Sequence, residues 1–324
     1  MKAKAKAHLF DQARDAEQRG NREGRDLWDR YTGHREHVTA AILSVAETVG
    51  VSVAGTAGAS VAGTAGVSVA GPAGGSGGRL CLLGAGNGND LDLAALAARF
   101  DEIHLVDIDE AALARAINRQ SPAVRAKLRP HAPVDLSGLY RELDVAAARR
   151  RHGDELVAAG TAAVLAKLPE CFDVVASCCV LSQMGWALSR AFQAEAAEEL
   201  PALEQALVAI HLRTLVALTQ PAGVALLIAD LVSSEAYPID ALDANADLPE
   251  LVRRLSEARI AYAVCNPDLI RQLLRRDPEL RALCAPSEMK PPWLWTGSKD
   301  LTYLVYPLIL RPLRSPLPAP RGEG

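Results

Sequence analysis

The sequence has few cysteines, no long apolar segment and no excess of one charge, and each absence excludes a class of protein. Its six cysteines form no Cys-x-x-Cys pair and no Cys/His grouping with zinc spacing, so we expect no metal site. The N-terminal segment is charged and lacks the apolar stretch of a secretory signal. Apolar runs are interrupted well before the ~20 residues that a membrane helix needs. We therefore expect a soluble, cytoplasmic protein with reduced thiols and no membrane partner.

The charges are balanced, with 35 Lys and Arg against 39 Asp and Glu in 324 residues and a net charge of −4. This balance creates no overall field that would attract nucleic acid, although a local basic groove would still be compatible with it. Apolar residues make up 49% of the chain, which is enough for a sizeable core. A nucleic-acid partner is therefore not expected from composition.

Composition divides the chain into four parts. Residues 1–49 carry apolar side chains at helical spacing, from Trp28 to Val45, and predict an N-terminal helical cap with a break near Gly33. Residues 50–78 repeat the unit SVAGTAGA and are rich in glycine, a composition typical of a flexible linker. Residues 79–310 form the main domain, and the proline-rich residues 311–324 predict a disordered tail.

The main domain alternates strand-like and helix-like segments. Apolar runs predict strands at 79–83, 103–107, 172–177, 224–230 and 302–310, and a weaker strand ends near Pro133–Asp135. Helical patterns occupy 90–100, 109–120, 201–218, 248–259 and 267–283. Repeated alternation with near-continuous apolar strands predicts an α/β fold, with a doubly wound and mostly parallel sheet covered on both faces.

Ligands of such folds bind beyond the carboxyl ends of the strands, and two strand ends carry a signal. The first reads Leu83-Gly-Ala-Gly-Asn-Gly-Asn-Asp90, in which Gly84 permits a tight turn and Gly86 a close approach of a ligand to the backbone. Asn89 stands where a dinucleotide motif has its third glycine. The second strand ends at Asp107, whose carboxylate could accept hydrogen bonds from both hydroxyls of a ribose.

A purely structural interpretation is open as well. The glycine turn could serve to pack against a helix, and Asp107 could cap the helix that starts near Asp109. The series of turn, strand and acid nevertheless favours a nucleoside site.

The segments LCLLGAGNGNDL, IHLVDID, FDVVAS and GVALLIAD together resemble the class I S-adenosylmethionine-dependent methyltransferases. The resemblance covers about 79–310. It implies a seven-stranded, doubly wound sheet in which the last strand, here TYLVYPLIL, is antiparallel. It also implies S-adenosylmethionine as cofactor and methyl transfer by in-line displacement as the reaction.

The resemblance assigns roles to individual positions. The first turn would lie under the methionine and ribose, Asp107 would bind the ribose hydroxyls, and Ile108 would pack on the adenine. Because Leu82 stands where many members have an acid, Asp90 becomes a candidate partner for the cofactor's amino group. The implied cofactor-binding residues are Gly84, Ala85, Gly86, Gly88, Asp90, Asp107, Ile108, Asp135, Leu136 and Ser177.

Methyl transfer asks little of side chains beyond holding the acceptor in line and excluding water, so catalytic residues are weakly specified. Ser177 and Cys178 would face the methyl group or the substrate. Tyr31 and His34 could belong to a lid over the site, or to an amphipathic helix with solvated side chains. Asp230 could orient an amine or hydroxyl, or cap the next segment.

Two further segments carry the same ambiguity. The insert at 266–284 contains Arg271, Arg275, Arg276 and Arg281, which could roof an anionic substrate or form a solvated helix face. In PPWLW, Trp293 and Trp295 alternate as on a strand, and one of them could reach the cleft.

The sequence thus predicts methyl transfer to a small molecule, since the cap and the insert would enclose the cleft. The fourth strand lacks the Asn/Asp-Pro-Pro-aromatic motif of enzymes that methylate amino groups of nucleic acids. Three alternatives stay open: an NAD(P)-dependent oxidoreductase, a non-catalytic S-adenosylmethionine-binding module, and a methyltransferase acting on RNA or protein.

Overall fold

A central sheet of eight strands organises the molecule. The computed structural model describes residues 2–51, 77–140, 153–169, 171–192, 198–297 and 300–313. Most of the predicted linker and most of the predicted tail lie outside these ranges. The strand order is β3-β2-β1-β4-β5-β8-β6, and β7 pairs with β8. The strands are β1 (Arg79–Leu83), β2 (Glu102–Val106), β3 (Leu128–His131), β4 (Phe172–Cys178), β5 (Thr219–Ser233), β6 (Glu288–Met289), β7 (Trp293–Thr296) and β8 (Thr302–Leu310).

The sheet confirms the predicted fold class. The ladders joining β3, β2, β1, β4 and β5 are all parallel, and β8 runs antiparallel to β5. The prediction of seven strands was one short. Two short strands precede β8: the two-residue β6, and β7, which the PPWLW segment forms. Both run antiparallel to β8, and either one can be counted as the additional strand. Antiparallel neighbours can be joined by short connections, so β6 and β7 can pair with the nearby β8, whereas a parallel strand would need a longer crossover.

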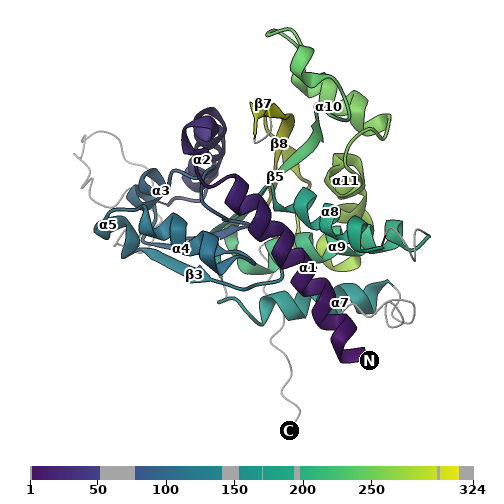
Figure 1. The fold of residues 1–324 in the computed structure, drawn as a ribbon, viewed down its shortest axis with the longest axis horizontal. Helices are drawn as coiled ribbons and strands as arrows, with labels where there is room; N and C mark the ends of the chain where they lie inside the picture. The colour runs from purple at the N-terminus through teal and green to yellow at the C-terminus, as the bar shows by residue number, and fades with distance from the viewer. Residues whose placement is uncertain are drawn as a thin grey trace, which may run out of the picture.

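Helices cover both faces of the sheet (Figure 1). One face carries α2 (Thr32–Thr48), α3 (Leu93–Arg99), α4 (Glu110–Asn118) and the single turn α5 (Pro122–Arg125). The other carries α7 (Asp154–Leu165), α8 (Val180–Phe192), α9 (Leu200–Leu218), α10 (Leu248–Glu257), α11 (Pro267–Arg276) and α12 (Pro278–Leu283). Short 3-10 turns occupy Trp28–Tyr31, Ile239–Ala241 and Ala263–Cys265.

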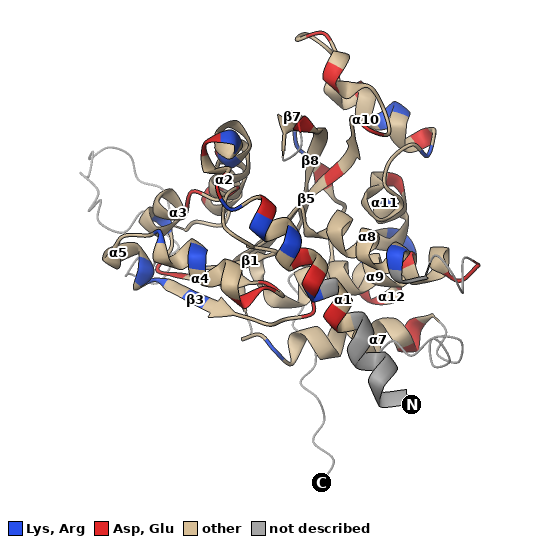
Figure 2. Cartoon of the chain, viewed as in Figure 1, with Lys and Arg blue, Asp and Glu red and all other residues tan. Residues whose placement is uncertain are grey.

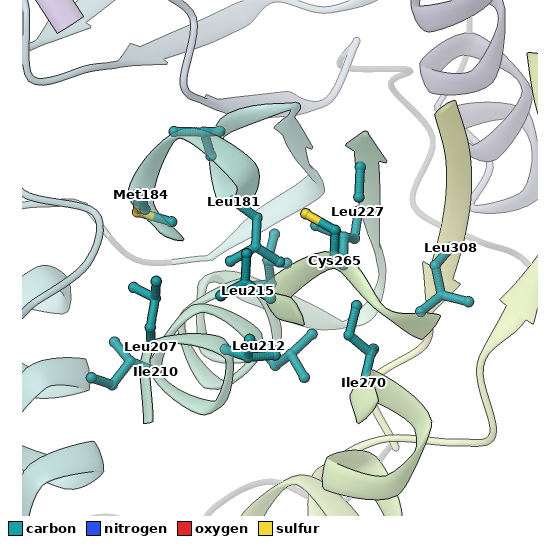
Figure 3. Packing of buried hydrophobic residues seen from close by; sticks show 14 of the residues in the cluster. Leu181, Met184, Leu207, Ile210, Leu212, Leu215, Leu227, Cys265, Ile270 and Leu308 are labelled. Atoms are coloured by element: carbon teal, nitrogen blue, oxygen red, sulfur yellow. The ribbon is translucent and has the colours of Figure 1, made fainter. Parts of the chain in front are cut away.

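Strand alternation divides the core into two layers. Along β4, Val175 packs with the α8–α9 layer, while Val174 and Ala176 pack with the α2–α3 layer. Figure 3 shows the first layer, where Leu181 of α8 and Leu215 of α9 meet Leu227 of β5. Burying each such side chain contributes about 1.5–3 kcal/mol. Among the described helices α9 alone has the length and hydropathy of a membrane span, and most of it is buried in this core.

The N-terminal segment forms two helices, as predicted, but the break was placed wrongly. Helix α1 (Lys2–Glu23) ends before Gly24, whereas Gly33 lies in the first turn of α2. α1 stops there because the carbonyl oxygens of Asn21 and Gly24 accept hydrogen bonds from side chains of the turn after β1. Helix α2 then buries Val38 and Ile42 in the same core as the sheet.

Candidate functional site

A cavity of about 760 Å³ opens at the carboxyl ends of β1, β2, β4 and β5, and residues of α1 contribute to its lining. In Figure 1, helix α1 runs in front of the sheet. This volume falls within the ~300–1,000 Å³ range of sites for small ligands. Residues of the β1 turn, Asp107 and the end of β4 line one part of the cavity. Asp230, Tyr262, Trp295 and Tyr303 line the other. Of the ten predicted cofactor residues, Gly84, Ala85, Gly86, Asp90 and Asp107 line it.

The turn after β1 needs its glycines. Gly84 has a φ of +78°, and a Cβ there would lie 2.5 Å from the Cβ of Val180. Gly86 has a φ of +46° and donates its N–H to Asp107 Oδ2 at 2.7 Å. Gly88, predicted to lie under the cofactor, does not line the cavity. A Cβ at Gly88 would instead meet Ala116 of α4 at 3.3 Å, so this glycine serves helix packing.

Asp107 faces the turn and the cavity, and it does not cap α4. Its Oδ1 accepts the N–H of Asp109 at 2.8 Å, and Asp109 itself caps the helix by accepting the N–H groups of Ala111 and Ala112. The capping interpretation of Asp107 is therefore wrong. Burial raises the pKa of Asp107 to about 6, because a charged carboxylate is costly where water is scarce.

Asp90 lies at the end of the turn and lines the cavity. Its pKa is raised to about 7, first by burial and then by the negative charges of Asp230 and Asp107. The charge of Arg35 acts in the opposite direction but does not reverse the shift. A carboxyl group that titrates near neutral pH in a cavity is suited to exchange a proton with a ligand.

Helix α1 is held to the turn by two asparagines, a feature that sequence reasoning missed. Asn87 Nδ2 donates to the carbonyl oxygen of Asn21 at 2.6 Å, and Asn89 Nδ2 donates to that of Gly24 at 2.7 Å. Carbonyl groups at a helix end lack partners in the helix, so these bonds anchor the end of α1. Asn89 replaces the third glycine of a dinucleotide motif because its amide performs this anchoring.

The same helix brings acid and amide groups over Asp107. Asn21 Nδ2 donates to Asp109 Oδ2 at 3.1 Å. Glu17 lines the cavity, and its pKa is raised to about 8 by burial and by the charges of Asp107 and Asp109. Figure 2 shows acidic and basic residues interspersed along α1. No local pattern in the sequence identifies Glu17 or Asn21 as site residues.

The residues expected at the adenine do not line the cavity. Ile108 is buried against Phe10 of α1 and Tyr140. Asp135 uses its carboxylate to hold its own loop, accepting the N–H groups of Ser137 and Tyr140. Leu136 is buried in the core layer of α8 and α9. α1 thus covers the position where the resemblance expects the adenine to pack.

Ser177 was predicted to face the substrate, and the structure contradicts this. It is fully buried on the far face of β4, where its Oγ lies 2.8 Å from His211 Nε2 of α9. Because successive side chains of a strand point to opposite faces, Cys178, for which the same prediction was made, does line the cavity. Cys179 follows with a φ of +51° and also lines the cavity.

Asp230, at the end of β5, lines the cavity as predicted. Its Oδ2 accepts a hydrogen bond from Ser182 Oγ at 2.9 Å, and its Oδ1 has no hydrogen-bond partner. The side chain is only 7% exposed. Burial raises the pKa of Asp230 above its usual range.

Aromatic side chains from α2, β7 and β8 form one wall of the cavity. Trp295 stacks on His34 at a centroid distance of 4.3 Å and on Tyr303 at 5.2 Å, and Tyr31 tilts against it at 4.9 Å. Of the two tryptophans in PPWLW, Trp295 reaches the cavity and Trp293 is buried behind it.

His34 is a structural part of this wall and neither solvated nor a base. Its Nδ1 accepts a hydrogen bond from Trp293 Nε1 at 3.1 Å, so Nε2 carries the proton and no lone pair is free. Burial lowers its pKa to about 3, which keeps the ring neutral. Burial also raises the pKa of Tyr31, so the phenol stays protonated.

The arginine-rich insert does not roof the cavity. Arg271, Arg275, Arg276 and Arg281 lie on α11 and α12 and are absent from the cavity lining. Among the described residues, no three His, Cys, Asp or Glu side chains are grouped so as to hold a metal ion.

Comparisons with known proteins give weak similarities. No protein-family model matches the sequence, and no curated protein matches it. Solved structures that are similar include a putative RNA methyltransferase, PH1948, from Pyrococcus horikoshii, at 13% identity and a TM-score of 0.33, covering 74% of this chain and 76% of that one. YcgJ from Bacillus subtilis is similar at 11% identity and a TM-score of 0.39, and the match covers 74% of this chain and 93% of that one. A third similar structure is that of the O-methyltransferase TomG from Streptomyces achromogenes in complex with SAM. Its sequence identity is 14% and its TM-score is 0.33, and the match covers 72% of each chain.

Proposed function

We propose that this protein is an S-adenosylmethionine-dependent methyltransferase. The observation that carries the proposal is the arrangement of Gly84, Gly86 and Asp107 on one cavity, at the end of a sheet that β8 closes antiparallel. The turn offers backbone without side chains, and the acid offers a carboxylate that ribose hydroxyls can bond.

The sheet separates this proposal from an oxidoreductase. The doubly wound dinucleotide fold orders its strands 3-2-1-4-5-6. Here an antiparallel strand, β8, lies between β5 and β6 instead. Asn89, in place of the third glycine, is committed to holding α1. Both features favour the methyltransferase over the nicotinamide-dependent enzyme.

The charges of the cavity suit this cofactor. Asp90, Asp107, Asp230 and Glu17 all line it, and burial raises the pKa of each. A cationic ligand relieves this accumulation of buried acids. S-adenosylmethionine supplies a methyl group on a positively charged sulfur. Asp107 would hold its ribose, and Asp90 lies where the amino group could be bonded.

The remaining tasks fall to this chain's own residues. α1 and the wall of Tyr31, Trp295 and Tyr303 exclude water and fix the acceptor, which together lower the barrier to displacement. The volume of the cavity, within the range of sites for small ligands, supports a small-molecule acceptor rather than a nucleic acid. The six free thiols agree with a cytoplasmic location.

Replacing Asp107 by Ala tests the cofactor site. Two charge-assisted hydrogen bonds at roughly 1.5–3 kcal/mol each would be lost, so calorimetry should show S-adenosylhomocysteine binding at least about 150-fold more weakly. Asp92→Ala is the matched control, since Asp92 caps α3 outside the cavity and its loss should cost about 1 kcal/mol of stability only. Equal affinities of wild type and Asp107→Ala would place the cofactor elsewhere.

A further inference from the structure

We infer that the acceptor is an amine, held as its cation by Asp230 at the end of the cavity that Tyr262 and Tyr303 line. The inference rests on the proposed methyl transfer and names the class of substrate. Its starting point is a buried carboxylate that the protein leaves without a counter-charge.

Asp230 lacks the partners that a buried acid normally has. The hydroxyl of Ser182 donates to its Oδ2 and the thiol of Cys179 also bonds the carboxylate, but both partners are neutral, and Oδ1 accepts no N–H or O–H donor. Among the described residues, no Lys or Arg forms an ion pair with it. A buried charge is expensive unless it is paired, so a ligand of opposite charge gains more here than a neutral one.

The side chains around Asp230 provide hydrogen-bond acceptors and aromatic surface, and they add no positive charge. Tyr31, Tyr262 and Tyr303 all interact electrostatically with Asp230 and line the same cavity. His34 beside them is neutral, with its lone pair taken by Trp293. Phenol oxygens can accept the remaining N–H groups of an ammonium, and aromatic surface favours an organic cation over a metal ion.

The position of Asp230 separates it from the ribose. Glu17 interacts with Asp107 and Asp109, whereas Asp90 interacts with both Asp107 and Asp230. Asp107 follows β2 and Asp230 lies on β5, and β1 and β4 separate these two strands in the sheet, so Asp230 lies away from the position of the ribose. An acceptor held at Asp230 would then occupy a part of the cavity that the ribose leaves free.

The transfer balances with these groups alone. The ammonium gives one proton to the Asp230 carboxylate, and the freed nitrogen lone pair forms a bond to the methyl carbon. The carbon–sulfur bond breaks, and its electron pair returns to sulfur. The products are a neutral thioether and the methylated ammonium, and the carboxylic acid returns its proton to water.

The test compares an amine with its neutral isostere. With S-adenosylhomocysteine saturating, 2-phenylethylamine and 2-phenylethanol are titrated into wild type, Asp230→Asn and Glu235→Gln. Asp230→Asn keeps the shape and removes the charge. Glu235→Gln is the matched control, because Glu235 is an exposed acid five residues further on that does not line the cavity.

We expect the wild type and Glu235→Gln to bind the amine at least about ten-fold more tightly than the alcohol, and Asp230→Asn to lose this preference. A wild-type preference for the alcohol, or an amine affinity unaffected by Asp230→Asn, would overturn the inference. So would weaker binding of S-adenosylhomocysteine to Asp230→Asn, since Asp230 would then belong to the cofactor. Failure of S-adenosylhomocysteine to bind the wild type would instead refute the proposed function.

Discussion

Glu17 makes the docking of α1 depend on pH. Its pKa is raised from its usual 4.5 to about 8, with burial the main cause and Asp107 and Asp109 adding to it. The docked helix therefore prefers the protonated acid. The contribution of protonated Glu17 to the docking of α1 is fully present below pH 4.5 and is lost as the pH rises through 8.

The magnitude follows from these two values. Between pH 6.5 and 8.5 the free helix has Glu17 ionised throughout, while the docked helix must release its proton. Linkage then gives a loss of about 2 kcal/mol, or roughly a 25-fold change in the opening equilibrium. Because α1 can lift off locally, the loss appears in α1 before it appears in global unfolding.

Hydrogen exchange of the α1 amides at the two pH values, corrected for intrinsic rates, measures this opening. We expect about 25-fold less protection at pH 8.5 in the wild type, and no such difference in Glu17→Gln. Asp15→Asn, an exposed acid on the same helix, should behave as the wild type. Persistence of the full pH effect in Glu17→Gln would refute the assignment to Glu17.

Two substitutions test the scaffold by urea unfolding. Gly84→Ala should lower the free energy of unfolding by about 3 kcal/mol, because Gly84 has a left-handed backbone angle and the new methyl group would overlap Val180. Gly20→Ala is the control, since no atom lies near its Cβ, and it should stabilise α1 by up to about 1 kcal/mol. A Gly84→Ala protein as stable as the wild type would contradict the turn geometry. Ile42→Ala should cost about 2–5 kcal/mol because α2 is part of the core. A cost below about 0.5 kcal/mol would mean that α2 is a detachable cap.

The strands could be read from the sequence because they are buried on both faces. The run 79–83 and the run 302–310 match β1 and β8 residue for residue. Continuous apolar segments of this length have few other stable places in a fold. The residues at the strand ends predicted more of the site than the helical segments did, because the glycines require a particular backbone geometry and Asp107 provides a charge.

Features that depend on distant contacts escaped prediction. The carbonyl of Asn21 meets the side chain of Asn87, 66 residues away, and neither residue is unusual in its own segment. The end of β4 reads Ser-Cys-Cys, in which no polar alternation shows which side chain faces the cavity. Both Ser177 and Cys178 were predicted to face the substrate, and only Cys178 lines the cavity. Trp295 was recognised as a strand residue, but its stacking with His34 joins β7 to α2, which no local pattern reveals.

The measurement that tests the central claim most directly is calorimetric titration of the full chain with S-adenosylhomocysteine, with NAD and NADP in parallel. The arrangement of Gly84, Gly86 and Asp107 on one cavity, in a sheet whose antiparallel strand β8 lies between β5 and β6, predicts micromolar binding of S-adenosylhomocysteine and no binding of either nicotinamide nucleotide. Binding of NAD or NADP, without binding of S-adenosylhomocysteine, would contradict the account and make the protein an oxidoreductase.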